Sequence, residues 1–367
     1  MNSAMIAVAG AGKTEWITSS ALREKNPSRT LVLTFTTTNQ HEDALRMVMK
    51  SHPGENIPKV VGWRAFVMNE IVKPYLPKRY PAVHMSGLSL KDPNSFQYLS
   101  GQSRHFTSSG KAYPSLLGKL AYDVNKDSNG RAIKRIENLY DTIYIDEGQD
   151  LRGNDLCVLE ELLKSSIDVH IVLDPRQSTL STAPRDRKYV KDYSSASIIE
   201  LYRKWHKQGL IDLDYLSETK RFTDQIARFS DCVFDLGLNP TISNVPIRGR
   251  HDGVFLIEKS RVKEYSESYQ ATALAVQKSQ DIDAYESVNF GLSKGMTRDD
   301  IVILATGPIE KFLETGTRLP PKSACGFYVA ITRAKYSVAI AVTNPKITLN
   351  SMRLNSIWDN IRLEALT

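Results

Sequence analysis

The stretch that decides the fold is "AVAGAGKTEW", residues 7–16. It follows a short apolar run and leads into a segment of helical composition, which is the context of a phosphate-binding loop. An anion at the positive end of that helix would be met by the loop's backbone N–H groups, those of Gly10, Ala11 and Gly12. In this arrangement Lys13 would reach the β- and γ-phosphates, and Thr14 would bind Mg²⁺. The stretch predicts nucleotide binding without separating a kinase from a motor.

Size and charge narrow the class of protein. The chain has 367 residues, of which 41% are hydrophobic and 24% charged, so it has room for two or three packed lobes. No apolar run approaches the ~20 residues that span a bilayer. No basic leader precedes the loop, so a cytoplasmic protein without a membrane partner is expected. The net charge of +7 suits nucleic acid, but a soluble basic protein without that partner has the same charge.

Apolar runs rich in β-branched residues predict buried strands of parallel sheets. In the first part of the chain these runs are residues 4–9, 30–35, 59–63, 141–146 and 168–173. A second series comprises residues 253–258, 300–306 and 336–343. Helical segments lie between the strands, which predicts an α/β fold with doubly wound, mostly parallel sheets. The chain is therefore expected to form two lobes, joined around residues 195–212.

A stretch of different composition, residues 74–138, interrupts the first series of strands. It is rich in Pro, Gly and Ser, and its Lys and Arg residues are interleaved with Tyr and Phe. Such a mixture can follow a phosphate backbone and stack bases. The same aromatic residues could equally form the small core of an inserted subdomain. The three cysteines, far apart and without neighbouring histidines, predict neither a disulfide framework nor a zinc site.

Two adjacent carboxylates end one predicted strand in "DTIYIDEGQD", residues 141–150. The carboxyl ends of parallel strands are where such a sheet binds its ligand. Asp146 is suited to the Mg²⁺ shell, and Glu147 to accepting a proton from a water that attacks the γ-phosphate. Together with Lys13, these acids predict a site for nucleotide hydrolysis.

The chain resembles the UvrD/Rep/PcrA-like superfamily 1A helicases. The loop has their A-x-x-G-x-G-K-T form and "DEGQD" their D-E-x-Q-D form, and the remaining motifs follow in the family's order. These are "LTFTTTNQHEDALRMVM" (33–49), "VLDPRQST" (172–179), "LSETKRFTDQI" (216–226), "LSKGMTRDDIVIL" (292–304) and "YVAITRAK" (328–335). The resemblance covers almost the whole chain.

The resemblance implies two RecA-like P-loop lobes and a role for each matching residue. The first lobe would occupy residues 1–73 and 139–205, with 74–138 as an inserted accessory subdomain and candidate DNA contact, and the second lobe 206–367. The implied catalytic residues are Lys13, Glu147, Gln177, Arg221 and Arg333. The implied nucleotide contacts are Gly10, Ala11, Gly12, Lys13, Thr14, Asp146 and Gly295, with Thr14 and Asp146 as metal ligands. The implied DNA contacts are Phe35, Thr36, Trp63 and Lys294.

The sequence departs from the family pattern at several places. Thr182 stands where the family has an aromatic ring that stacks on bases, and Thr297 replaces an expected glutamate. The interval from Phe222 to Leu292 is too short for the family's large insertion in the second lobe. These departures predict a minimal motor with altered stepping on its track.

The resemblance implies an ATP- and Mg²⁺-dependent translocase or helicase on single-stranded DNA, or on a duplex with a single-stranded tail, moving 3′→5′. RNA is also left open as the track. The alternative is a helicase-like, nucleotide-gated ATPase that senses DNA and serves a protein partner such as a nuclease. A small-molecule kinase shares the phosphate loop but leaves "YVAITRAK" unexplained.

Overall fold

The computed structural model describes residues 1–52, 54–276, 287–291, 293–354 and 362–363, without the side chains of residues 37 and 38. The described chain folds into two compact units. The first unit consists of Met1–Ile6, Lys13–Leu173 and Leu180–Asp214, and the second of Ala7–Gly12, Asp174–Thr179 and Tyr215–Thr367. Two short segments from the first half of the sequence thus belong to the second unit.

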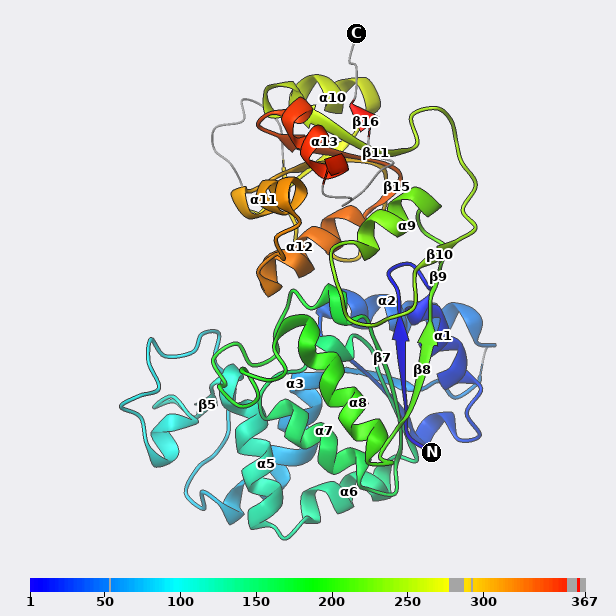
Figure 1. Cartoon of the computed structure of the whole chain (residues 1–367). Coiled ribbons are helices and arrows are strands. Elements are labelled where there is room, and N and C mark those ends of the chain that lie inside the picture. The colour runs from blue at the N-terminus through cyan, green and yellow to red at the C-terminus, as the bar shows by residue number, and fades with distance from the viewer. Residues whose placement is uncertain (53, 277–286, 292, 355–361, 364–367) are drawn as a thin grey trace. The chain divides into compact units, whose positions relative to one another are not determined.

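A six-stranded sheet in the order β3-β2-β6-β7-β1-β8 organises the first unit. Its strands are β1 Ser3–Ala7, β2 Thr30–Thr34, β3 Lys59–Gly62, β6 Thr142–Ile145, β7 Asp168–Leu173 and β8 Asp212–Leu216. β1 pairs in parallel with β7, β7 with β6, β6 with β2 and β2 with β3. Every residue of β2 and β6 is buried, as expected for a sheet that helices cover on both faces (Figure 1).

One helix of the first unit, α2, begins at a clear capping residue. The Thr36 side chain caps α2 by accepting a hydrogen bond from the Asn39 N–H at 3.1 Å. The α-helices are α1 Lys13–Leu22, α2 Thr37–Lys50, α3 Trp63–Phe66, α4 Lys73–Tyr75, α5 Leu117–Asp127, α6 Arg131–Leu139, α7 Asp155–Leu163 and α8 Ile199–Lys207. A π-helical turn, η2 Val67–Val72, joins α3 to α4. The 3₁₀ turns are η1 Pro27–Arg29, η3 Leu76–Lys78, η4 Gly101–Arg104, η5 Pro114–Leu116, η6 Gly148–Asp150 and η8 Ser195–Ile198.

Residues 74–138 fold as part of the first unit. They contain the small sheet of β4 Gly87–Leu88 and β5 Lys111–Ala112 as well as α5 and α6. Some of their aromatic rings pack on one another: Tyr80 meets Phe106 edge-on at 6.1 Å, and Phe96 meets Tyr113 at 5.7 Å. These rings therefore build a local core, whereas Tyr98 is 86% exposed.

The second unit has its own six-stranded sheet, in the order β13-β12-β14-β15-β11-β16. All five neighbouring pairs are parallel. The strands are β11 Gly253–Glu258, β12 Thr272–Ala275, β13 Val288–Asn289, β14 Arg298–Leu304, β15 Ala334–Val342 and β16 Arg362–Leu363, and a separate pair is β9 Glu218–Thr219 with β10 Ile242–Ser243. The helices are α9 Asp224–Asp231, α10 Val262–Tyr269, α11 Gly307–Thr315, α12 Pro321–Ile331 and α13 Pro345–Leu354, with 3₁₀ turns η7 Pro175–Gln177 and η9 Lys259–Arg261.

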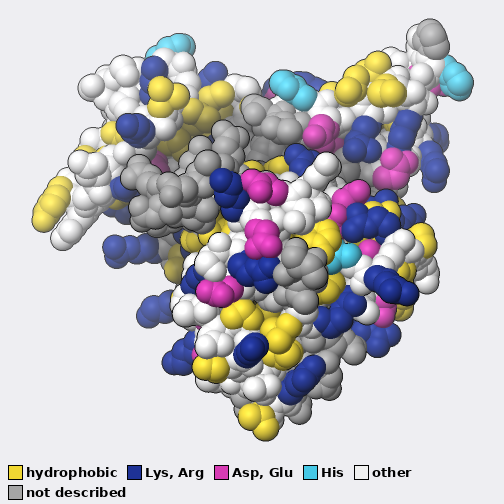
Figure 2. All heavy atoms as spheres, turned by 90° about the horizontal axis from the view of Figure 1, so that it is seen from above, with side chains coloured by type: hydrophobic (Ala, Val, Ile, Leu, Met, Phe, Trp, Pro, Cys, Tyr) yellow, Lys and Arg dark blue, Asp and Glu magenta, His cyan; other side chains and the backbone are white. Residues whose placement is uncertain are grey.

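The predicted fold class is confirmed: the chain is α/β, with two helix-covered parallel sheets. Residues 195–212, where the sequence predicts the joint, carry η8 and α8 and lead into β8 at the edge of the first sheet. No helix in the described ranges is long and apolar enough to cross a membrane. On the face shown in Figure 2, Lys and Arg side chains are spread widely, with Asp and Glu among them.

Candidate functional site

The phosphate loop has the predicted position, between β1 and the first residue of α1, Lys13. Gly10 and Gly12 have φ angles of +76° and +86°, a conformation that favours glycine. A Cβ atom on Gly10 would lie 2.4 Å from the Cβ of Arg221 and 2.6 Å from Oγ1 of Thr219. Gly10 is therefore required by the close approach of the Arg221 segment, in addition to its backbone angles.

The two predicted acids follow β6 directly. Asp146 is 2% exposed, and its N–H donates to the Leu33 carbonyl at 2.9 Å. Glu147 has a φ of +54°, which is strained for a residue with a side chain. In this conformation its N–H donates to Oδ1 of Asp146 at 2.8 Å. Gln149 Nε2 donates to Oε2 of Glu147, so the strained backbone and this amide fix both carboxylates.

A third carboxylate, Asp43 in α2, belongs to the same surroundings. Burial, followed by the charges of Glu147 and Asp43, raises the pKa of Asp146 well above its usual range, and Lys13 opposes this shift. Asp43 is 1% exposed, and neither of its carboxyl oxygens has a hydrogen-bond partner among the described residues. Burial raises its pKa to about 7, with Arg46 opposing the shift. We call Asp43, Asp146 and Glu147 the acidic cluster.

The donors near Lys13 fit the Mg²⁺ that the sequence predicts. Thr14 offers a hydroxyl oxygen in the first turn of α1 and Asp146 a buried carboxylate. Within the described residues, no group of three or more His, Cys, Asp and Glu side chains could hold a metal. Mg²⁺ commonly binds through one or two carboxylates together with substrate phosphates, so this sparse donor set suits it and no all-protein cage is needed.

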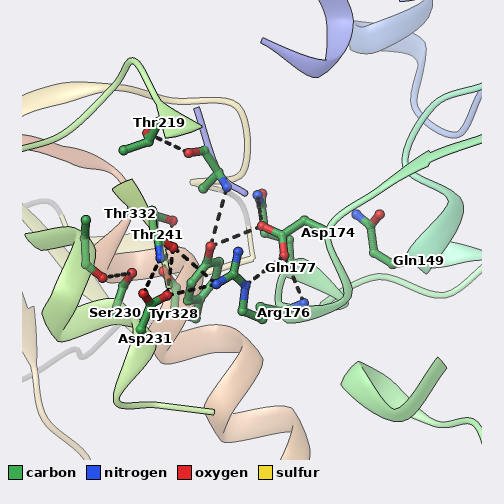
Figure 3. Close-up of polar contacts among 12 residues, drawn as sticks. Gln149, Asp174, Arg176, Gln177, Thr219, Ser230, Asp231, Thr241, Tyr328 and Thr332 are labelled. Atoms are coloured by element: carbon green, nitrogen blue, oxygen red, sulfur yellow. Dashed lines mark hydrogen bonds and ion pairs between the residues drawn. The ribbon is translucent and has the colours of Figure 1, made fainter. Parts of the chain in front are cut away.

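A buried polar network surrounds Asp174 in the second unit (Figure 3). Its Oδ2 accepts hydrogen bonds from Gln177 Nε2 at 2.9 Å and from the Tyr328 hydroxyl at 3.2 Å. Its Oδ1 accepts from Arg176 Nε at 3.1 Å. The Tyr328 hydroxyl in turn accepts from the N–H of Ala9 in the phosphate loop, at 3.4 Å. We call this the Asp174 network.

Arg176 extends the network to α9. Its Nη1 lies 3.0 Å from Oδ1 of Asp231, and its guanidinium sits 4.7 Å from the centre of the Tyr328 ring. Burial and the neighbouring Asp174 raise the pKa of Tyr328, against the opposing charge of Arg176, so the hydroxyl stays protonated and able to donate. Each buried charge of the network therefore has an opposite charge beside it.

The two predicted arginines meet other predicted residues within the second unit. Arg333 is 1% exposed, and its Nη2 lies 3.4 Å from Oε1 of Gln177. Arg221 donates from Nη1 to the Thr332 carbonyl at 3.4 Å, and its backbone N–H donates to Oγ1 of Thr219 at 3.2 Å. The Thr219 hydroxyl donates to the Ala9 carbonyl at 2.8 Å. Both arginines thus belong to the unit that contains residues 7–12 of the phosphate loop.

The predicted nucleotide contact Gly295 lies in an exposed turn with a φ of +91°. Lys294, the residue before it, is half-buried. The carbonyl of the next residue, Met296, accepts a hydrogen bond from Nη1 of Arg333 at 3.4 Å. The turn therefore lies beside Arg333, although Leu292, where the quoted motif begins, is outside the described residues.

The predicted DNA contacts of the first unit line one cavity of about 480 Å³, which we call the aromatic pocket. The ring centres of Phe35 and Trp63 lie 6.1 Å apart. Phe35 and Thr36 are half-buried, whereas Trp63 is 1% exposed. The structure thus brings these three residues to one cavity, in which Trp63 contributes to the inner wall and not to an open face.

Thr182 also lines the aromatic pocket, and its hydrogen bonds tie its loop to neighbouring segments. It is 6% exposed, and its N–H donates to the Asp150 carbonyl at 3.1 Å. Its Oγ1 accepts from the Arg152 N–H at 3.2 Å, and its carbonyl accepts from Arg64 Nη2 at 2.8 Å. Thr182 therefore fastens a loop at the place where the family pattern has a stacking ring.

Sequence reasoning missed Asp43 and the partners of Asp174. Asp43 has an acidic neighbour, Glu42, and nothing in the local sequence separates the buried carboxylate from the exposed one. Tyr328 and Arg176 lie inside quoted motifs, but their meeting depends on tertiary contacts. Only the full motif set, taken as a spatial constraint, could have pointed to them.

No known protein-family profile matches the chain, and no curated protein sequence matches it. Among solved structures, the chain is similar to arterivirus nonstructural protein 10, a helicase, with 11% identity and a TM-score of 0.48 over 94% of this chain. The complex of the arterivirus helicase with DNA gives the same values. The chain spans 61% and 62% of the lengths of those two proteins.

Proposed function

We propose that the protein hydrolyses ATP to move along nucleic acid, as a translocase or helicase of superfamily 1. The observation that carries the proposal is the placement of two arginines within the second unit. Within it, Arg221 lies against Gly10 of the phosphate loop, and Arg333 reaches Gln177. A kinase for small molecules would account for the phosphate loop but leaves "YVAITRAK" (328–335), the segment that contains Arg333, unexplained.

In the proposed reaction, Lys13 neutralises charge on the β- and γ-phosphates. Mg²⁺, when bound by Thr14 and Asp146, would supply further positive charge at the phosphates. Glu147 accepts a proton from the water that attacks the γ-phosphate, forming ADP and phosphate. Burial and the charges of Glu147 and Asp43 raise the pKa of Asp146, and a cation bound beside it would favour the ionised carboxylate.

Arg221 and Arg333 are proposed to balance the charge that grows on the γ-phosphate during transfer. Arg333 is oriented by the Val329 carbonyl, which accepts from its Nε at 2.9 Å. The proposal requires that both arginines and Lys13 serve one nucleotide. Binding and release of that nucleotide would then close and open the two units and drive stepping.

Single-stranded DNA is the proposed track, with 3′→5′ movement by analogy with the UvrD-like family. The aromatic pocket supports a single strand, because bases stack on aromatic rings only where they are unpaired. Lys294 lies in the turn beside Arg333 and is proposed as a second contact to the strand. Stacking does not separate DNA from RNA, so RNA belongs in the test.

A second candidate function is favoured by Thr182. Because this residue holds a loop in place and has no aromatic ring, stacking on successive bases would be weaker than in helicases that have a ring at this position. The protein would then act as a nucleotide-gated ATPase that senses DNA and serves a partner such as a nuclease, with little unwinding of its own.

The test is ATP hydrolysis measured in parallel with single-stranded DNA, duplex DNA, RNA and no nucleic acid, together with strand displacement on a tailed duplex. Stimulation by single strands with displacement supports the helicase. Stimulation without displacement supports the sensing ATPase. Turnover that no nucleic acid changes would overturn both.

A further inference from the structure

A second cavity of the first unit, of about 800 Å³, is lined by five cations and one carboxylate. The cations are Arg104, Lys119, Arg185, Arg187 and Lys188. We call this cavity the basic groove. One wall comes from residues 94–119 of the inserted stretch and the other from residues 184–190. None of these residues belongs to the motifs that carry the proposed function.

The one carboxylate that lines the groove, Asp186, accepts hydrogen bonds from Asn154, just before α7, and from its own loop. It is 7% exposed, and its Oδ2 accepts from the backbone N–H of Asn154 at 2.8 Å and from Asn154 Nδ2 at 2.7 Å. Its Oδ1 accepts from the Lys188 N–H at 2.9 Å. A Cβ on Gly153 would lie 2.4 Å from the Asp186 carboxyl carbon, so the loop is tightly anchored. Lys119 is paired with Asp123, which leaves four lining cations against Asp186, so the groove keeps an excess of positive charge on a fixed backbone.

Contacts to the inserted stretch hold the two walls together. Arg185 Nη1 donates to the Asn94 carbonyl at 3.0 Å and also to the Pro93 carbonyl. The Arg185 N–H donates to Ser115 Oγ at 3.3 Å. Arg104 Nη1 donates to the Phe96 carbonyl at 3.0 Å. Arg185 and Arg104 thus hold the structure together as well as supplying charge, whereas the Arg187 side chain makes no hydrogen bond or ion pair with the described residues.

The loop of the basic groove continues the wall of the aromatic pocket. Leu180, Ser181 and Thr182 line the aromatic pocket, and the wall of the basic groove begins at Pro184. Only Ala183 and Pro184 lie between Thr182 and Arg185, so the Cα atoms of Thr182 and Arg185 lie at most ~11 Å apart. A strand whose bases enter the aromatic pocket would have its neighbouring phosphates within reach of the basic groove.

We propose that the basic groove binds the phosphodiester backbone of the single strand whose bases occupy the aromatic pocket. This inference rests on the proposed function. At Thr182 there is no ring to stack on a base, and the groove would instead hold the strand by its phosphates. Contacts to phosphates do not depend on the identity of the base. Binding through it is accordingly strongly salt-dependent and insensitive to sequence.

The test compares Arg187→Ala/Lys188→Ala with the charge-matched control Lys204→Ala/Lys207→Ala, whose lysines are exposed on α8 of the same unit. Fluorescence anisotropy measures binding of deoxythymidine oligomers of about 4 and about 12 nucleotides over a range of salt concentrations. For the longer oligomer, the groove variant is expected to reduce the slope of log K against log salt by about 1.4, or ~0.7 for each lost phosphate contact. The short oligomer and the control variant should keep the wild-type slope.

An abasic strand of the longer length should show the same loss in the groove variant, since its phosphates are intact. If the groove variant binds the long oligomer with wild-type affinity and slope, the groove inference is wrong while the proposed function stands. If the wild-type protein binds neither oligomer, the proposed function itself fails. Competition by inorganic pyrophosphate as strong as that of the long oligomer would assign the groove to a small anion and overturn the inference.

Discussion

The acidic cluster of the first unit and the Asp174 network of the second both bury charged side chains, but they differ in how these charges are paired. In the network, Asp174 has Arg176 at 3.1 Å and the Tyr328 hydroxyl at 3.2 Å. In the cluster, Asp43 is buried without a hydrogen-bond partner in the described part of the chain, and the carboxylates raise one another's pKa. Charge that is paired within the protein supports the fold, whereas crowded negative charge is costly until a cation arrives.

The comparison explains why the two regions are suited to different tasks. The acidic cluster has an excess of negative charge. Lys13 is the nearby cation that lowers the pKa of Asp146. The Asp174 network is already neutralised, so it can orient Gln177 and, through it, Arg333. Substitutions in the acidic cluster and in the Asp174 network should therefore have different consequences.

Replacing Lys13 by alanine is expected to have the largest effect. It removes the cation of the phosphate loop and leaves the acidic cluster with less compensation, so ATP hydrolysis should fall to background. Steady-state ATPase with single-stranded DNA measures it, and Lys311→Ala, an exposed lysine of α11, is the control. Wild-type turnover in Lys13→Ala would mean that the loop does not hold the substrate phosphates.

Asp43→Asn should stabilise the nucleotide-free protein at high pH. The pKa of Asp43 is raised from 3.8 to about 7, so ionisation costs more in the folded than in the unfolded state. The wild type therefore loses stability as pH rises from about 4 through about 7, by roughly 4 kcal/mol for one such group. Asp43→Asn avoids that loss, and the two proteins converge near pH 4.

Urea unfolding across this pH range tests the Asp43 prediction. Glu42→Gln alters the exposed neighbouring carboxylate, whose charge contributes less to the Asp43 shift than burial does, so this variant should keep most of the wild-type loss of stability. Equal stability of Asp43→Asn and wild type at about pH 8 would show that Asp43 is neutralised by a partner, as in the Asp174 network, and would remove the contrast between the two regions.

Phe35→Ala is expected to weaken single-strand binding by ~1–3 kcal/mol if a base stacks on this ring. Tyr98→Ala is the matched control, because Tyr98 is an exposed aromatic residue of the same unit. Anisotropy with a short oligomer isolates the aromatic pocket. Unchanged affinity would leave Phe35 as a packing partner of Trp63.

Tyr328→Phe should have the smallest effect, a loss of about 1–2 kcal/mol in the free energy of unfolding. The variant keeps the ring but removes the hydroxyl that donates to Asp174 and accepts from Ala9. Tyr215→Phe, at an exposed tyrosine, serves as the reference in the same urea titration. No difference between the two variants would mean that the network does not depend on this hydroxyl.

The sequence predicted the elements whose pattern is uninterrupted. The predicted strands 168–173 and 253–258 have the bounds of β7 and β11, because both are short runs made up mostly of apolar residues. β8 was missed, since "DLDYL" is largely exposed at the sheet edge and reads as a polar segment. α5 and α6 were missed because the Pro, Gly and Ser content around them masks two helices stabilised by tertiary packing.

The site shows the same division. The positions of Lys13, Asp146 and Glu147 at the ends of their elements followed from local pattern alone. The network of Tyr328 with Asp174 joins residues 154 positions apart, so only the folded chain brings them together. The basic groove likewise depends on residues 94–119 meeting residues 184–190, and neither segment has a motif.

The most direct measurement of the central claim is single-turnover ATP hydrolysis by Arg333→Ala with single-stranded DNA, beside Arg333→Lys and with nucleotide affinity measured separately. If Arg333 balances charge on the γ-phosphate, the rate should fall ~10³-fold or more with a much smaller change in affinity. Partial recovery is also expected in the lysine variant, which keeps the charge. A folded Arg333→Ala protein that hydrolyses ATP at the wild-type rate would contradict the account.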